Sequence, residues 1–209
     1  FLCKEQITPA MFADCAALHF CSVDLVDWPV KAAHRRAIGL AQEAGALISF
    51  DPNVRLPLWE RPEDCQAAIR AFLPFADLVK LSDDEVEFVT GCKEEREAAR
   101  RLFAGGCRML LVTRGADGAA IYTRGAHAET ETIPVPVTDT TGAGDSFIGS
   151  FLYQLTRDGV TAEQLDRLSE ERLASYLQFS ARYASLTVQR KGAVMATLEE
   201  LRRAYPDKE

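Results

Sequence analysis

The residues best suited to chemistry form one string, Asp139-Thr140-Thr141-Gly142-Ala143-Gly144-Asp145-Ser146-Phe147. Beyond it, apolar residues recur at helical spacing, so the two glycines lie where a loop becomes a helix. Glycine lets the backbone approach a ligand closely, and the first turn of a helix has free N–H groups, so the string predicts an anion-binding site. A carboxylate beside that site repels a resident anion. Asp145 is therefore expected to face a nucleophile while the amides face a group in transfer.

Other glycine-rich motifs fail on spacing. A dinucleotide-binding G-x-G-x-x-G would need glycine at position 147, which is phenylalanine, and neither Gly-Lys-Ser/Thr nor G-x-S-x-G occurs at this string. A simpler interpretation is that Asp145 caps the helix and the glycines only form a turn. The string by itself leaves that alternative open.

Composition excludes several classes of protein. The 209 residues carry 24 Lys+Arg against 31 Asp+Glu, for a net charge of −7, and have no basic block, so nucleic-acid binding is not expected. No apolar run reaches the ~20 residues that span a bilayer, so no membrane partner is expected. Six cysteines without a C-x-x-C pair, and three histidines without an H-E-x-x-H pattern, indicate reduced thiols in the cytoplasm rather than disulfides or zinc.

The elements that must position the string follow an α/β pattern, because short apolar runs alternate with amphipathic segments. Strands are predicted at 18–23, 47–50, 78–80, 109–113 and 119–122, and helices at 29–44, 62–73, 82–91, 93–104, 144–157, 162–189 and from 197 onward. Strand–helix–strand connections join parallel strands. We therefore predict a single α/β domain over residues 1–209, with a mostly parallel sheet flanked by helices.

Four further segments complete a known pattern: Asp51–Arg55, Lys80–Glu85, Thr113–Gly118 and Arg190–Ala193. With residues 139–147, they resemble the ribokinase-like (PfkB) carbohydrate kinases, whose C-terminal signature is D-T-x-G-A-G-D-x-F. The resemblance covers nearly the whole chain but only about the C-terminal two-thirds of such a kinase. It implies a ribokinase-like, Rossmann-like layered fold that carries the ATP site and the catalytic base. The N-terminal di-glycine sugar-binding motif and the lid of the family are expected to be missing.

The resemblance implies roles for the signature residues. Asp145 would be the general base that takes the proton of the sugar hydroxyl. The amides of Gly142, Ala143 and Gly144 would hold the charge that develops on the γ-phosphoryl group of ATP. The implied nucleotide-binding residues are Lys80, Ser82, Glu85, Thr113, Gly115, Gly118 and Gly144.

Several of these positions, and Ala181 in a later helix, carry alternatives or depart from the family pattern. Glu85 would place Mg²⁺ through water, but Ser82 replaces the usual Asn, and Ser-x-x-Glu is also an ordinary capping box. Residues 113–118 are also typical of a plain hairpin turn. Ala181 stands where the family commonly has Asn beside adenine, so recognition of the base must depend on packing or on another residue.

A monovalent cation site, such as a K⁺ site, is implied at Asp139, Thr141, Arg190 and Gly192. The alternative is that Asp139 and Thr141 only form a turn.

The substrate side is implied by Asp51-Pro52-Asn53-Val54-Arg55 followed by Leu58-Trp59, which resembles fructokinases and 2-keto-3-deoxygluconate kinases. The resemblance implies that Asn53, Arg55 and Asp145 bind the sugar. A surface Arg55, with Trp59 in the core, is the alternative.

These features together predict an ATP- and Mg²⁺-dependent sugar kinase, first of all a fructokinase, acting on a small-molecule sugar. A 2-keto-3-deoxygluconate kinase, or another carbohydrate kinase of the family, is the second interpretation. A non-catalytic nucleotide-binding regulatory domain is the third, because Ser82 and Ala181 depart from the pattern. The sequence leaves open which sugar is used, and a homodimer is one option for the oligomeric state.

Overall fold

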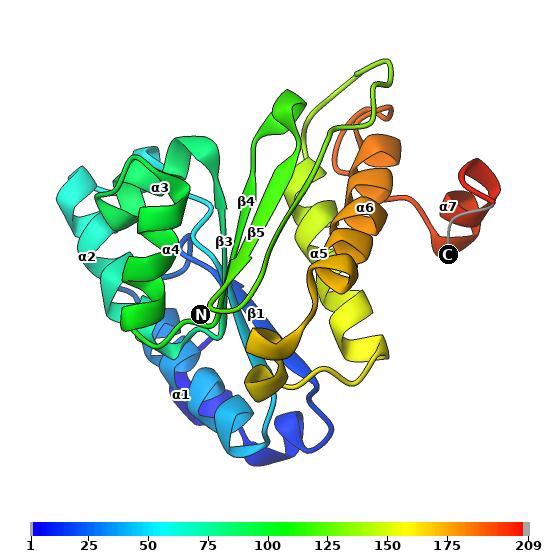
Figure 1. Cartoon of the computed structure of the whole chain (residues 1–209). Helices are drawn as coiled ribbons and strands as arrows, with labels where there is room; N and C mark the ends of the chain where they lie inside the picture. The colour runs from blue at the N-terminus through cyan, green and yellow to red at the C-terminus, as the bar shows by residue number, and fades with distance from the viewer. Residues whose placement is uncertain (1, 207–209) are drawn as a thin grey trace.

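The computed structural model describes residues 2–206, and its centre is a six-stranded sheet (Figure 1). The strands lie in chain order, with the bounds β1 Ala17–Cys21, β2 Leu47–Asp51, β3 Leu78–Ser82, β4 Met109–Thr113, β5 Ala119–Thr123 and β6 His127–Thr130. Strands β1 to β4 are parallel, whereas β5 and β6 each run antiparallel to the preceding strand. The sheet is thus mostly parallel, as expected, and becomes antiparallel where short turns replace crossover helices.

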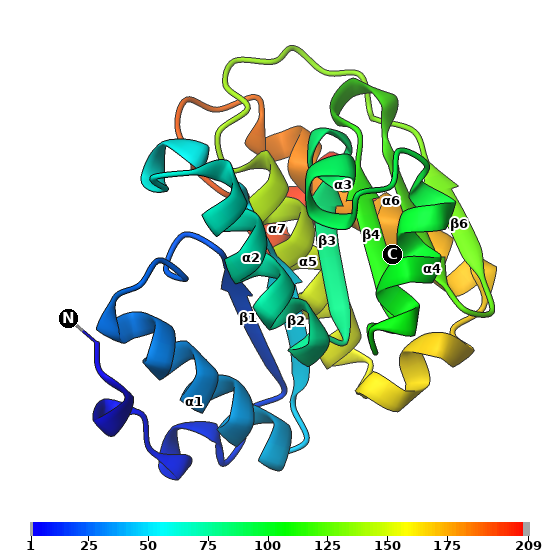
Figure 2. The same ribbon diagram turned by 90° about the vertical axis from the view of Figure 1, so that its left-hand side faces the viewer.

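Helices cover both faces of the sheet (Figures 1 and 2). One face carries α1 Pro29–Glu43, α2 Pro62–Phe72, α3 Asp83–Thr90 and α4 Glu95–Ala104, and the other carries α5 Ala143–Arg157 and α6 Glu170–Thr187. A last helix, α7 Leu198–Ala204, packs on α6. Short 3₁₀ helices occupy Lys4–Gln6, Pro9–Phe12, Leu56–Leu58, Leu73–Phe75, Gly115–Asp117 and Ala162–Arg167. Within residues 2–206, the structure has no helix of the length and apolarity needed to span a membrane.

The hydrophobic core is divided into two clusters by the sheet. Side chains such as Phe20, Phe50 and Val79 pack with α1 to α4. Their neighbours along the strands, such as Leu47 and Leu78, pack with α5 and α6. Because successive strand residues point to opposite faces, each central strand supplies both clusters.

The predicted helix over 162–189 is wrong in one respect, because the structure breaks it. A 3₁₀ helix ends at Arg167, and α6 begins at Glu170. Ser169 is the N-cap of α6, and its Oγ accepts a hydrogen bond from the Arg172 N–H at 3.3 Å. A side chain that satisfies a helix-end amide makes this start favourable.

Gly118 fixes the turn between β4 and β5, and its replacement tests the turn. Its φ is +91°, and a Cβ added there would lie 1.9 Å from the Thr130 carbonyl oxygen. We expect Gly118→Ala to lower the free energy of unfolding by at least roughly 1–3 kcal/mol, from strain and steric overlap. Urea unfolding measures this. The control, Gly39→Ala in α1, adds a Cβ with no atom within 4 Å and should be neutral or stabilising. Equal stabilities for the two variants would contradict the turn geometry.

Candidate functional site

The signature string folds as predicted, with its glycines at the start of α5. Gly142 is the N-cap with a φ of +79°, and a Cβ there would lie 3.1 Å from the Ala193 Cβ. The next three residues form the first turn, and the first helical hydrogen bond runs from the Ser146 N–H to the Gly142 carbonyl at 2.8 Å. Within the described part of the chain, the N–H groups of Gly142, Gly144 and Asp145 have no protein acceptor, whereas the Ala143 N–H donates to the Thr140 carbonyl at 3.1 Å. Three open amides, one of them that of the exposed Asp145 itself, therefore lie together at the start of α5.

Two buried charges lie beneath this turn. The ammonium of Lys80, the middle residue of β3, forms an ion pair at 2.9 Å with Oδ2 of Asp51, the last residue of β2. Lys80 is 6% exposed and Asp51 is 3% exposed. The Lys80 Nζ lies 3.2 Å from the position that a Cβ of Gly144 would take. Burial raises the pKa of the Asp51 carboxyl, and the Lys80 ammonium opposes that shift. Gly144 is thus small for a tertiary reason, because any side chain would press on the Lys80 ammonium.

A second polar pair lies next to the first on the same sheet face. His19 of β1 stands opposite Ser49 of β2, and the His19 Nδ1 is 3.0 Å from the buried Ser49 Oγ. Partial removal from water lowers the pKa of His19, and Lys80 lowers it further, although Asp145 opposes them. A polar layer of His19, Ser49, Asp51 and Lys80 therefore underlies the amides and Asp145.

Three members of this layer were not predicted from the sequence: His19, Ser49 and the Asp51 side chain. A usable signal was the alternation of Leu47, Ser49 and Asp51, because a period of two places all three on one sheet face. Polar residues at two such positions of a buried strand indicate a polar environment.

The lowered pKa of His19 gives a testable prediction about protonation. Its midpoint in the folded protein should lie below the ordinary value of 6.5, so the imidazole should be neutral at pH 7. As the pH falls, the His19 imidazole of the unfolded chain therefore takes up a proton at a higher pH than that of the folded chain. The stability linked to His19 is complete above pH 6.5 and is lost as the pH falls towards the folded pKa. NMR titration of the imidazole C–H signals, assigned with His19→Gln, measures the midpoint. A midpoint at or above 6.5 would contradict the described environment.

Glu85 connects the start of α3 to the loop after β2. Its Oε2 accepts a hydrogen bond from the Ser82 N–H at 2.9 Å, so the capping box is present, and its Oε1 accepts one from the Val54 N–H at 2.6 Å. In that loop Asn53 has a φ of +47°. Arg55 is exposed and donates to the Val54 carbonyl at 3.1 Å. Within residues 2–206, no recorded contact joins Arg55 to the signature string.

The predicted phosphate and ribose loop follows β4. Thr113 stands opposite Ser82 in the parallel register, so these two predicted nucleotide residues are neighbours at the carboxyl ends of their strands. The turn is held by hydrogen bonds from the Arg114 N–H to the Gly118 carbonyl at 2.8 Å and from the Thr132 Oγ1 to the Gly115 carbonyl at 2.6 Å. Ligands of open α/β sheets bind at such carboxyl ends.

The predicted cation-site residues are brought together in part. Asp139 Oδ1 accepts hydrogen bonds from the Thr141 N–H and Oγ1 at 2.9 and 2.7 Å, and its Oδ2 accepts one from the Gly192 N–H at 2.8 Å. These bonds lower the pKa of the Asp139 carboxyl. The Arg190 guanidinium instead turns to Glu200 Oε1 at 2.7 Å. Arg190 could therefore contribute only its backbone carbonyl to a cation near Asp139.

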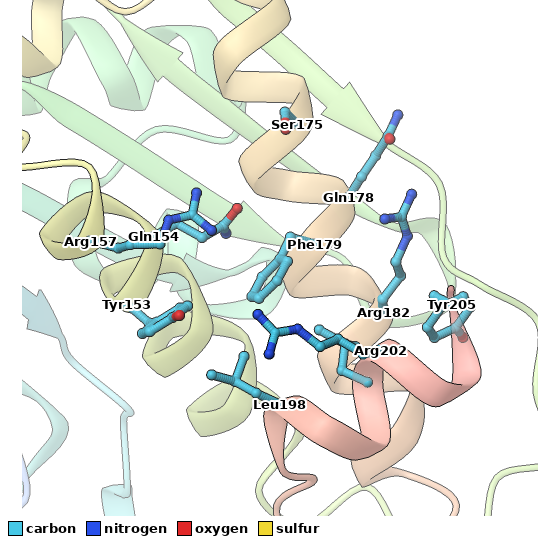
Figure 3. A pocket seen from close by; sticks show the side chains of 11 residues that line it. Tyr153, Gln154, Arg157, Ser175, Gln178, Phe179, Arg182, Leu198, Arg202 and Tyr205 are labelled. Carbon is cyan, nitrogen blue, oxygen red and sulfur yellow. The ribbon is translucent and has the colours of Figure 1, made fainter. Parts of the chain in front are cut away.

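Two cavities of the structure lie away from this turn. One of about 400 Å³ is formed by α5, α6 and α7, with Arg157, Phe179 and Arg202 in its wall (Figure 3). Another, of about 280 Å³, includes Ala181, the position expected near adenine, and Tyr205. Neither cavity includes a residue of the signature string. The first is formed by the later turns of α5, so we do not assign it to the chemistry of Asp145.

The chain is similar to known proteins of one family. Residues 6–200 match the family described as pfkB family carbohydrate kinase. "Probable fructokinase-2" of Arabidopsis thaliana is 39% identical over 193 residues, which are 92% of this chain and 57% of that protein. Fructokinase-2 of Solanum lycopersicum is 39% identical, over 91% of this chain and 58% of its own length. A further Arabidopsis relative, also named as a fructokinase, is 40% identical over 92% of this chain and 90% of itself.

Solved structures of fructokinases have a fold similar to that of this chain. A fructokinase with bound ATP from Xylella fastidiosa has a TM-score of 0.89 and 31% identity, over 99% of this chain and 67% of that one. The Vibrio cholerae fructokinase with fructose, ADP and calcium has a TM-score of 0.79 and 28% identity, over 97% and 65%. These matches confirm the fold expected from the sequence. The chain spans less than three-fifths of the length of two of the curated relatives above.

Proposed function

Because the chain belongs to the pfkB family of carbohydrate kinases, we propose that it supplies the ATP side and the catalytic base of an ATP-dependent fructokinase. The observation that carries this proposal is the start of α5, where the open amides of Gly142, Gly144 and Asp145 and the exposed Asp145 carboxylate lie next to the Lys80 ammonium. Such an arrangement can hold a phosphoryl group in transfer and accept a proton beside it. The sugar-kinase relatives named above support the same reaction.

In the proposed reaction, the Asp145 carboxylate takes the proton of a sugar hydroxyl. The resulting oxygen forms a bond to the γ-phosphorus of ATP, the bond from that phosphorus to the bridging oxygen breaks, and ADP leaves with the bonding electrons. The N–H groups of Gly142 and Gly144 hold the equatorial oxygens while their charge changes. The Ala143 amide joins them if it leaves the Thr140 carbonyl to which it now donates.

The remaining predicted residues are proposed to bind ATP, Mg²⁺ and the sugar. Thr113, Gly115 and Gly118 would border the phosphates and ribose, with Lys80 and Ser82 beside them. Mg²⁺ bound with ATP neutralises phosphate charge. The Glu85 carboxylate fits a role through water, because each oxygen accepts one backbone N–H and retains a lone pair. Asn53 and Arg55 would contact the sugar. Glu85 holds the loop that carries them, because its Oε1 accepts a hydrogen bond from the Val54 N–H.

The cation proposal predicts a dependence on monovalent salt. Asp139, Thr141 and the carbonyls of 190–192 would hold K⁺ next to the amide turn, so K⁺ should raise turnover more than Na⁺ does. Turnover in equal concentrations of KCl and NaCl measures this, and Asp139→Asn should remove the difference. Equal rates in both salts would remove these residues from a metal role and would leave the kinase proposal standing.

The kinase proposal is tested on the gene product that contains residues 1–209. Release of ADP is measured with fructose, 2-keto-3-deoxygluconate and ribose, and thermal stabilisation is measured with ATP. Fructose-dependent ADP release is the expected result. Preference for the keto-sugar acid would redirect the substrate, and stabilisation without any turnover would favour a nucleotide-binding regulatory domain.

Compartment and assembly belong to the same proposal. Free thiols are found at Cys15, Cys21, Cys65, Cys92 and Cys107. Burial raises the pKa of Cys65 to about 11 and that of Cys107 to about 12, so these two are unreactive thiols. Free thiols support a reducing compartment such as the cytoplasm. A homodimer would be recognised from the molar mass in light scattering.

A further inference from the structure

In the reaction proposed above, Asp51 has no role, and Lys80 is placed beside the nucleotide without a stated action on the transferred group. Removing two charges from water costs several kcal/mol, and apolar residues of similar size are often as stable. Other residues of this sheet face show that alternative. Leu47 lies four positions before Asp51 on β2, Leu78 lies two positions before Lys80 on β3, and both are apolar and buried. The charges are therefore confined to the end of the sheet face that lies under the turn.

The place of the pair is electrostatically unusual. The N-terminus of a helix carries partial positive charge, so an ammonium beneath it is unfavourable. The Lys80 Nζ lies 3.2 Å from the ideal Cβ position of Gly144, the second residue of α5. The arrangement becomes favourable when an anion binds to the open amides, because the ammonium and the helix end then attract the same charge.

The position of the ammonium is set by Asp51. Asp51 Oδ2 holds the Lys80 Nζ at 2.9 Å, while Asp51 Oδ1 accepts a hydrogen bond from the Asn53 N–H at 3.1 Å. A carboxylate held at both oxygens has a fixed orientation, so the ammonium is also fixed. Among the described residues, Asp51 is the one recorded partner of the ammonium, which has three N–H donors. Donor capacity thus remains on a side chain that is nearly fully buried.

We propose that Lys80 is a positioning residue for phosphoryl transfer, which Asp51 holds under Gly144 so that its charge acts through the first turn of α5. The inference rests on the proposed function and deepens it. Because the ammonium lies against Gly144, it keeps the first turn of α5 in a fixed position. It also adds positive potential where the transferred group gains negative charge. Asp51 acts one step further away, by holding Lys80.

The test separates charge from structural support with two variants. Lys80→Gln keeps a hydrogen bond to Asp51 without the positive charge, and Lys80→Met combined with Asp51→Asn removes both charges. The double variant avoids an unpaired buried carboxylate, so its melting temperature should stay close to that of the parent. We expect kcat with fructose to fall by roughly 10- to 100-fold in both variants, with a smaller change in the KM for fructose. Lys31→Met combined with Asp27→Asn serves as the control, because it removes a surface pair at 3.9 Å in which Lys31 is half-buried and Asp27 is exposed.

A binding measurement distinguishes this role from general damage. ADP carries the phosphate charge and adenosine does not, so loss of the ammonium should weaken ADP and leave adenosine unchanged in calorimetric titration. A double variant that melts normally and retains the kcat and ADP affinity of the parent would overturn the proposal. An equal loss of ADP and adenosine affinity would also overturn it. If the parent protein releases no ADP with any sugar, the proposed function fails, and the two titrations still decide the role of Lys80.

Discussion

Replacement of Asp145 by Asn should lower kcat by roughly 10²- to 10⁴-fold, because it removes the proton acceptor and keeps the shape of the side chain. Asp145 is exposed at the third position of α5, and no protein donor is recorded for its carboxylate among the described residues. The Asn side chain of the variant therefore loses no hydrogen bond that the structure records for the Asp145 carboxylate. The affinity for ATP should change by no more than a few-fold.

Steady-state kinetics with fructose, and calorimetric titration with ATP, measure these two effects separately. Asp14→Asn, an exposed carboxylate outside the helices and strands, serves as the matched control and should leave kcat unchanged. Turnover close to that of the parent would show that Asp145 is not the base. A parallel loss of ATP affinity would instead assign its carboxylate to nucleotide binding.

Replacement of Gly144 by Val should reduce ATP affinity by more than about 100-fold, because the new side chain meets the Lys80 ammonium and moves the amide turn. The clearance to the Lys80 Nζ is 3.2 Å for a Cβ alone, and the two methyl groups of valine add to this overlap. The buried ammonium is held by Asp51, so it has little freedom to withdraw.

Gly149→Val provides a matched control on the same helix, because a Cβ at Gly149 meets no atom within 4 Å. The two variants share the change in intrinsic helix propensity, which for glycine to valine is only a few tenths of a kcal/mol. Circular dichroism melting verifies that both remain folded, and titration with ATP compares them. If both bind ATP as the parent does, the turn does not hold the triphosphate.

Local sequence was sufficient for much of the fold. Helices such as α1 and α5 and strands such as β2 and β4 were predicted to within a few residues, because hydrophobic period and glycine positions act over single segments. The break at Leu168 and Ser169 was missed, since the apolar pattern continues through it. There a cap decided the boundary, and a cap depends on backbone geometry.

The candidate site divides in the same way. The sequence by itself determined the start of α5 with its glycines and Asp145, because a loop, a helix start and their spacing lie within nine residues. It also determined the capping box of Ser82 and Glu85, which are three residues apart.

Only the tertiary structure decided what lies beneath and beside that turn. Lys80 meets Asp51 from 29 residues away, and His19 meets Ser49 from 30, because parallel pairing joins strands that helices separate in the chain. It also directed the Arg190 side chain to Glu200 and away from Asp139. Such contacts follow from strand register and from the burial of neighbouring elements, and each residue type taken alone is compatible with many partners.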